Sequence, residues 1–124
     1  MAAIESFRDL IAWQKGMFLA EKIYRATEDF PRREQFGLAM QLRKAAVSVP
    51  SNIAEGFGRH GRADYLHFLN IARGSLNEVQ TQIEIAERVG VISGEIPCEL
   101  QALALETARV LKGLINGLRN KGSS

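Results

Sequence analysis

The sequence predicts an all-α protein: an up-down-up-down antiparallel four-helix bundle. Apolar residues recur at alternating spacings of four and three over most of the 124 residues, which is the period of amphipathic helices packed side by side. Glycine and proline concentrate in three short breaks, and short connections favour antiparallel neighbours. No segment alternates apolar and polar residues over the length of a strand. We expect one domain over residues 1–124, with helices at about 7–27, 34–56, 62–89 and 96–119.

Each predicted helix carries an apolar stripe. The stripe in the helix over 62–89 keeps its spacing along the whole helix, and the helix over 96–119 repeats it, with Pro97 in the first turn, where proline is tolerated. The helices over 7–27 and 96–119 are apolar over a wider arc than one partner layer can cover, which indicates self-association. The stripe over 62–89 consists of Tyr65, Leu69, Ala72, Leu76, Val79, Ile83 and Ala86.

The predicted helix over 34–56 breaks the usual rules at its centre. Pro50 lies in the helix interior, where a proline removes a backbone hydrogen bond and costs about 3 kcal/mol, so we expect a kink there. The polar face of this helix is built from serine and asparagine, which are weak helix formers. Because small polar side chains permit close approach with hydrogen bonding, we interpret this region as a subunit contact or a channel lining; a solvated face is the alternative. The residues assigned to it are Ser48, Pro50, Ser51, Asn52 and Glu55.

Basic residues define a candidate nucleic-acid surface. Arg8, Lys15 and Lys22 recur every seven residues on the helix predicted over 7–27. Lysine and arginine hold nucleic acid through its phosphates without reading the bases. A solvated face, or pairing with acids of a neighbouring helix, is the alternative. The full set of candidates is Arg8, Lys15, Lys22, Arg43, Lys44, Arg59 and Arg62, of which the last two lie where a phosphate could dock at the start of the helix over 62–89.

The formal net charge of +2 conceals an uneven distribution. Residues 1–73 carry eleven Lys and Arg against eight Asp and Glu, residues 74–106 carry one against six, and residues 107–124 carry four against none. The basic segments can bind an anionic partner. Alternatively, the basic and acidic surfaces can face each other between helices or subunits.

The sequence offers no convincing catalytic, metal or cofactor site. Residues 56–61 match the letters G-x-G-x-x-G, but a predicted helix precedes them instead of a strand, so we interpret them as a helix end. One cysteine, Cys98, and two histidines, His60 and His67, are a poor ligand set for zinc. No serine lies in a strand-turn-helix elbow. We expect a non-enzymatic protein without cofactor or metal.

Nothing in the sequence indicates a membrane protein. No run of about 18 apolar residues is present, as a spanning helix requires. The first residues lack the basic and then apolar order of a signal peptide. We expect a cytoplasmic protein with no membrane partner.

Several segments also resemble a known family. The most specific is Ser-Val-Pro-Ser-Asn-Ile-Ala-Glu-Gly at 48–56. With these segments the chain resembles the four-helix bundle proteins encoded in intervening sequences of bacterial 23S rRNA genes. The accessory variability protein of diversity-generating retroelements is similar in fold, is more basic than this chain, and acts with a reverse transcriptase and nucleic acid. The matching segments are 10–15, 30–31, 34, 36–38, 41–43, 45–56 and 68–78.

The resemblance implies an up-and-down bundle that assembles into a homopentamer with a central channel, and it carries over no catalytic residue. Together with the basic residues, it predicts a non-enzymatic oligomeric scaffold that binds RNA or other nucleic acid through basic helix surfaces. The alternative is a ring-shaped adaptor that binds a protein partner and has no nucleic-acid role.

Overall fold

The computed structural model describes residues 3–121, and most of these residues lie in four long helices. Helices α1 to α4 span Ile11–Glu28, Leu38–Phe57, Arg62–Arg88 and Ile96–Lys121, and two short 3-10 helices, η1 at Phe7–Asp9 and η2 at Arg32–Glu34, precede α1 and α2. No residue in the described range belongs to a strand. The all-α, four-helix prediction is confirmed; positions 1–2 and 122–124 of the predicted domain lie outside the described residues.

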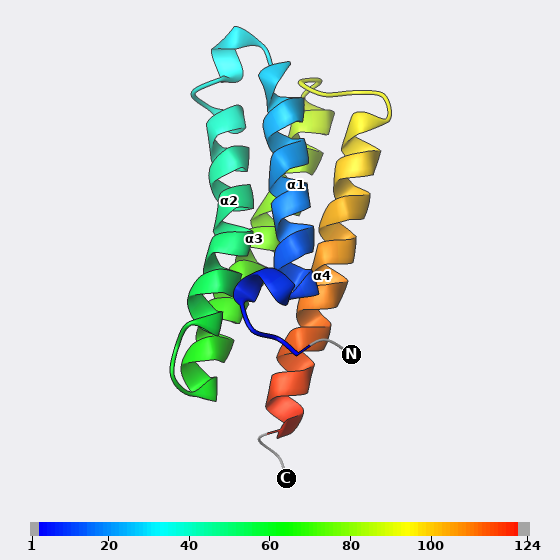
Figure 1. Ribbon diagram of the computed structural model, residues 1–124. Helices are drawn as coiled ribbons and strands as arrows, with labels where there is room; N and C mark the ends of the chain where they lie inside the picture. The colour runs from blue at the N-terminus through cyan, green and yellow to red at the C-terminus, as the bar shows by residue number, and fades with distance from the viewer. Residues whose placement is uncertain (1–2, 122–124) are drawn as a thin grey trace.

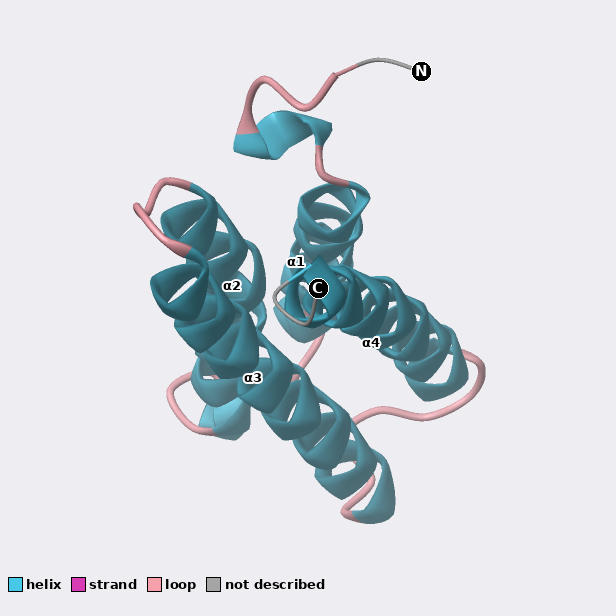
Figure 2. Cartoon of the chain, turned by 90° about the horizontal axis from the view of Figure 1, so that it is seen from below, coloured by secondary structure: helices cyan, strands magenta, loops and turns pink. Residues whose placement is uncertain are grey.

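The four helices pack as a closed ring of neighbours. Figure 1 shows successive helices running in opposite directions along the bundle. Each helix contacts the next in the chain, and α1 also contacts α4. Seen along the bundle in Figure 2, α2 and α3 lie on one side and α1 and α4 on the other. This arrangement brings α1 and α2 side by side, and their outer surface carries the candidate site described below.

The core consists of the aliphatic stripes of all four helices. The stripe predicted over 62–89 is buried from Leu69 to Ala86, and Tyr65 at its start is partly buried. The three buried polar residues all have hydrogen-bond partners within the chain, as buried polar groups require: Thr27 and Thr107 donate to backbone carbonyls, and Ser75 bonds to Ser48. None of the described helices is both long and apolar enough to cross a membrane.

The helix predicted over 7–27 is two elements. The side chains of Ser6 and Asp9 cap η1 reciprocally, which satisfies the backbone of a single short turn. Leu10 then takes an extended conformation, and α1 begins at the next residue. Arg8 therefore lies outside the helix that carries Lys15, so the predicted seven-residue line of cations does not continue through it.

The helix predicted over 34–56 starts later and runs without interruption through Pro50. Residues 32–34 form η2, and Gly37 has non-helical backbone angles, so α2 begins at 38. On the side of α1, Gly16 faces the proline: a Cβ added at Gly16 would lie 3.2 Å from Cγ1 of Val49 and 3.4 Å from Cδ of Pro50. The missing side chain lets the two helices approach closely at the proline. The kink at Pro50 stays a prediction.

At its other end α2 approaches α3 even more closely. A Cβ added at Gly56 would lie 2.9 Å from Cβ of Phe68 and 3.1 Å from the Tyr65 carbonyl oxygen. Both neighbouring atoms are held by the α3 backbone, so neither can move without moving the helix. Glycine at position 56 is therefore required by packing.

We predict opposite effects for two glycine substitutions. Gly56→Ala should lower the free energy of unfolding by about 1–3 kcal/mol, because the added methyl group forces α2 and α3 apart. Gly74→Ala should raise it by about 0.5–1 kcal/mol, because Gly74 is an exposed residue in the interior of α3, with nothing within 4 Å of an added Cβ. Urea unfolding followed by circular dichroism measures both. Equal stability of the two variants would contradict the close α2–α3 contact.

Candidate functional site on the α1–α2 surface

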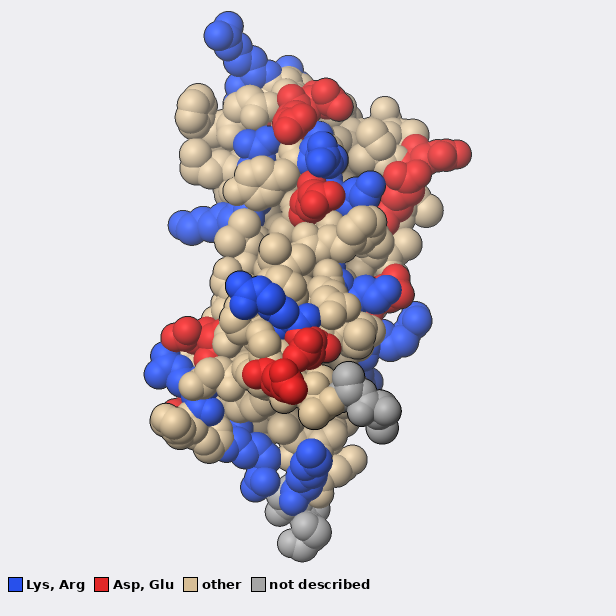
Figure 3. Space-filling model, viewed as in Figure 1, with Lys and Arg blue, Asp and Glu red and all other residues tan. Residues whose placement is uncertain are grey.

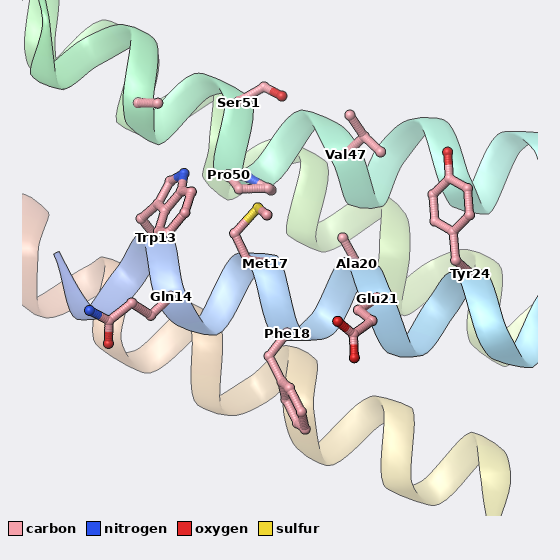
Figure 4. Close-up of a pocket in the computed structure, with 11 residues that line it drawn as sticks. Trp13, Gln14, Met17, Phe18, Ala20, Glu21, Tyr24, Val47, Pro50 and Ser51 are labelled. Carbon is pink, nitrogen blue, oxygen red and sulfur yellow. The ribbon is translucent and has the colours of Figure 1, made fainter. Parts of the chain in front are cut away.

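An apolar groove of about 730 Å³ runs between α1 and α2 on the outside of the bundle. Figure 4 shows Trp13, Met17 and Tyr24 extending from α1 toward α2, while Phe18 points away from α2. The α2 wall consists of Val47, Pro50, Ser51 and Ala54. Among the described residues, Glu21 is the one charged residue that lines the groove.

The groove is open to water although its walls are apolar. Met17 is 46% exposed and Val47 is 41% exposed. The wide apolar arc predicted for α1 explains the exposure: Leu19 and Ile23 fill the core, and no other helix among residues 3–121 covers Met17 and Phe18 on the second apolar side of α1. A contiguous exposed apolar surface of this kind is typical of an interaction site.

A second hollow of about 660 Å³ continues the groove toward the α1–α2 connection and shares Tyr24 and Val47 with it. Its remaining walls are Gln35, Phe36, Met40, Arg43 and Lys44. Nε of Arg43 donates to Thr27 Oγ1 at 2.7 Å, and the guanidinium carbon lies 4.9 Å from the centre of the Tyr24 ring. No acidic residue within the described part of the chain lines this hollow. It therefore combines aromatic and cationic side chains.

Two of the seven predicted cations are neutralised within the chain. Nζ of Lys15 lies 2.7 Å from Oε1 of Glu106 on α4, and this hydrogen bond, together with the ammonium charge, lowers the pKa of Glu106. Arg59 lies 2.6 Å from Oε1 of Glu55 and stacks on Phe68. Lys15 is therefore paired with an acid of a neighbouring helix, the alternative given for the line of cations, and Arg59 is paired with an acid four residues earlier in the chain.

The other five cations form no ion pair with any described residue. Arg8 and Lys22 lie over phenylalanine rings, and Arg62 is the first residue of α3. Arg43 and Lys44 line the second hollow. Figure 3 shows lysine and arginine spread over the visible face with acids among them, so the molecule has no uniformly basic side in this view.

The polar residues predicted as one face of α2 turn in different directions. Ser48 shares a hydrogen bond of 2.7 Å with Ser75 of α3, and Asn52 donates to the carbonyl and hydroxyl oxygens of Ser48 at 2.8 and 2.9 Å. Pro50 and Ser51 instead line the groove beside α1. Ser48 therefore bonds to α3 and Asn52 bonds to Ser48 within α2, so only Pro50 and Ser51 of the predicted set line the groove.

A comparison with models of known protein families shows which family the chain belongs to. The family model described as 23S rRNA-intervening sequence protein matches residues 8–113. The chain belongs to this family. A crystal structure of a protein with unknown function from the S23 ribosomal protein family of Bacteroides thetaiotaomicron is similar in fold, with a TM-score of 0.80 and 23% sequence identity over 86% of this chain and 96% of that chain. No curated protein matches the sequence.

In this family member, six exposed apolar residues that line the α1–α2 surface are absent from the set of site residues predicted from the sequence. They are Met17, Phe18, Tyr24, Phe36, Met40 and Val47. A signal for the α2 wall does exist, because Met40, Val47 and Ala54 recur every seven residues beside the core stripe. Phe36 lies in the connection, where no periodicity indicates its position. No group of three or more His, Cys, Asp or Glu within 3–121 could hold a metal ion.

We predict that Lys15→Gln raises the pKa of Glu106, because it removes the hydrogen bond and charge that lower it. A carboxyl whose pKa is lowered by folding stabilises the fold at neutral pH, and this contribution is lost as the pH falls through the folded pKa. The acid dependence of stability should therefore weaken in the variant. The carboxyl chemical shift of Glu106, followed by NMR during a pH titration, measures its pKa. Lys22→Gln is the control and should leave the pKa of Glu106 unchanged. An unchanged pKa of Glu106 in Lys15→Gln would contradict the ion pair.

Proposed function

We propose that this protein is a non-enzymatic oligomeric scaffold that binds RNA or other nucleic acid through basic helix surfaces. The observation that carries the proposal is the apolar groove between α1 and α2, which a single copy leaves exposed. Scattered apolar residues are ordinary on a protein surface, whereas a contiguous groove of them is typical of a contact with another molecule.

The groove supports assembly from copies of this chain. Five copies is the ring size that the family resemblance implies. Pro50 and Ser51 belong to the groove and to the predicted interface. Pro50 is buried against Gly16 and Ser51 is exposed, so Ser51 is our candidate for the contact. Ser48 and Asn52 already have partners within the chain, and Glu55 is paired with Arg59, so we do not propose a contact through them.

The unpaired cations support nucleic-acid binding. Lys22 lies on the exposed side of α1, Lys44 lies on α2, and neither forms an ion pair with a described residue. Arg62 adds a charge at the start of α3. Phosphates can therefore reach these side chains without displacing a carboxylate.

A ring-shaped adaptor for a protein partner is the second candidate. The same groove favours it, because an apolar surface with a single acidic residue suits a protein helix as well as a second copy. The two functions differ in the role of Lys22, Lys44 and Arg62, which only the nucleic-acid scaffold requires.

Met17→Glu tests the assembly. The substitution places a charge in the middle of the groove, where a subunit contact would remove it from water. We expect light scattering to give about five times the chain mass of 13.7 kDa for the wild type and a much smaller particle for Met17→Glu, with the circular dichroism of the helices retained. Met17→Leu is the matched control and should keep the wild-type mass. A monomeric wild type at micromolar concentration would refute the scaffold.

Salt dependence tests the nucleic-acid function. Because each phosphate contact to a single strand contributes about 0.7 to the slope of log affinity against log salt, replacing Lys22, Lys44 and Arg62 together by Gln should reduce that slope by about 2. Fluorescence anisotropy with labelled RNA measures it. Lys112→Gln on α4 is the control and should change the slope little. Absence of binding by the wild type at low salt would leave the protein adaptor as the supported function.

A further inference from the structure

The most exposed aromatic residue of the described chain lies at the α1–α2 connection. Phe36 is 86% exposed, and it lines the second hollow together with Tyr24, which is 45% exposed. Transfer of an aromatic ring from water into an apolar environment is favourable, and none of residues 3–121 covers this one. Two accessible rings therefore share one concave surface.

The backbone that presents Phe36 is held in place. Nε2 of Gln35 donates to the carbonyl oxygens of Thr27 at 3.1 Å and Phe30 at 2.8 Å, which ties the connection back to the end of α1. Phe30 is itself buried in the core. The exposure of Phe36 is thus imposed by the fold, because the residue before it is fixed by two hydrogen bonds.

Positive charge surrounds these rings. Arg43 donates to Thr27 Oγ1 and to the Tyr24 carbonyl oxygen, so its guanidinium is fixed beside the Tyr24 ring. Lys44 lines the same hollow, and residues 22–44 carry six Lys and Arg against three Asp and Glu. One of those acids, Glu34, accepts a hydrogen bond from the backbone N–H of Leu38 and so stabilises the first turn of α2.

This combination of aromatic rings and cations fits a nucleic acid, which carries planar bases and negatively charged phosphates. Bases stack on exposed aromatic rings whatever their sequence, and phosphates bind arginine and lysine alongside. In a double helix the faces of the bases are already stacked on one another, so only an unpaired strand can offer them. An apolar protein segment would use the rings and would leave Arg43 and Lys44, which have no carboxylate partner among residues 3–121, without one.

We propose that the hollow formed by Tyr24, Phe36, Arg43 and Lys44 is a stacking site for unpaired bases, through which the protein prefers single-stranded nucleic acid over duplex. This inference rests on the proposed nucleic-acid function and names the form of nucleic acid that the site selects. One or two bases stack on the rings, and the adjoining phosphates lie against the two cations.

The test compares a labelled single-stranded oligouridine of about 12 nucleotides with an RNA duplex of the same length in fluorescence anisotropy. We expect the wild type to bind the single strand more tightly. Phe36→Ala should weaken single-strand binding by about tenfold, with the salt slope and duplex binding unchanged, because the variant loses stacking and keeps every charge. Phe36→Trp should bind at least as well as the wild type.

Leu105→Ala is the control, since Leu105 is also a large exposed apolar residue, 55% exposed, and lies on α4, outside the hollow. It should leave single-strand affinity unchanged. Equal affinity of the wild type for single strand and duplex, or no loss in Phe36→Ala, would overturn the stacking site and leave the proposed function standing. A changed particle mass in Phe36→Ala with unchanged RNA affinity would assign the ring to a protein contact. No RNA binding by the wild type would refute both.

Discussion

The close approach of α2 to both of its neighbours is the constraint on which the rest of the structure depends. On one side, the missing side chain of Gly16 lets α1 pack closely against Pro50 of α2. On the other side, the missing side chain of Gly56 lets α2 pack closely against Tyr65 and Phe68 of α3. Ser48 and Ser75 add a hydrogen bond where the α2–α3 contact is polar. A small residue lies at each of these contacts, so the helices approach more closely than larger aliphatic side chains would allow.

The exposed groove is a consequence of that approach. Because Gly16 faces Pro50, the gap between α1 and α2 is narrow at this point. The bulkier residues of α1 on either side of Gly16 do not fit into it. Trp13 and Met17 lie along the outer edge of the contact, and Val47 faces them from α2. On the far side of α1, Lys15 is fixed to Glu106 of α4. The close contact and the buried core residues Leu19 and Ile23 orient the helix, and the partly exposed ion pair adds little to this.

The sequence predicts the regular parts of this molecule well, because periodicity reports burial directly. The α3 stripe from Leu69 to Ala86 lies in the core as expected. Periodicity does not report local capping, so the interruption at Leu10, which depends on the side chains of Ser6 and Asp9, was not predicted.

The candidate site was predicted only in part, for a similar reason. The polarity of Ser48 is visible in the sequence, but whether its partner belongs to the same chain depends on the distance between α2 and α3. Phe36 lies outside any periodic segment, and its environment follows from hydrogen bonds of Gln35 to residues five and eight positions earlier. Contacts of this kind require the tertiary structure.

The tie between Gln35 and the end of α1 has a thermodynamic consequence for recognition. A connection that is free in solution must be immobilised when a ligand docks, and each ordered residue opposes binding by its lost conformational entropy. Here the amide of Gln35 and the guanidinium of Arg43 have already fixed the segment in the unbound chain. The α1–α2 end of the bundle is therefore preorganised: a ligand that docks there meets its surface in final form.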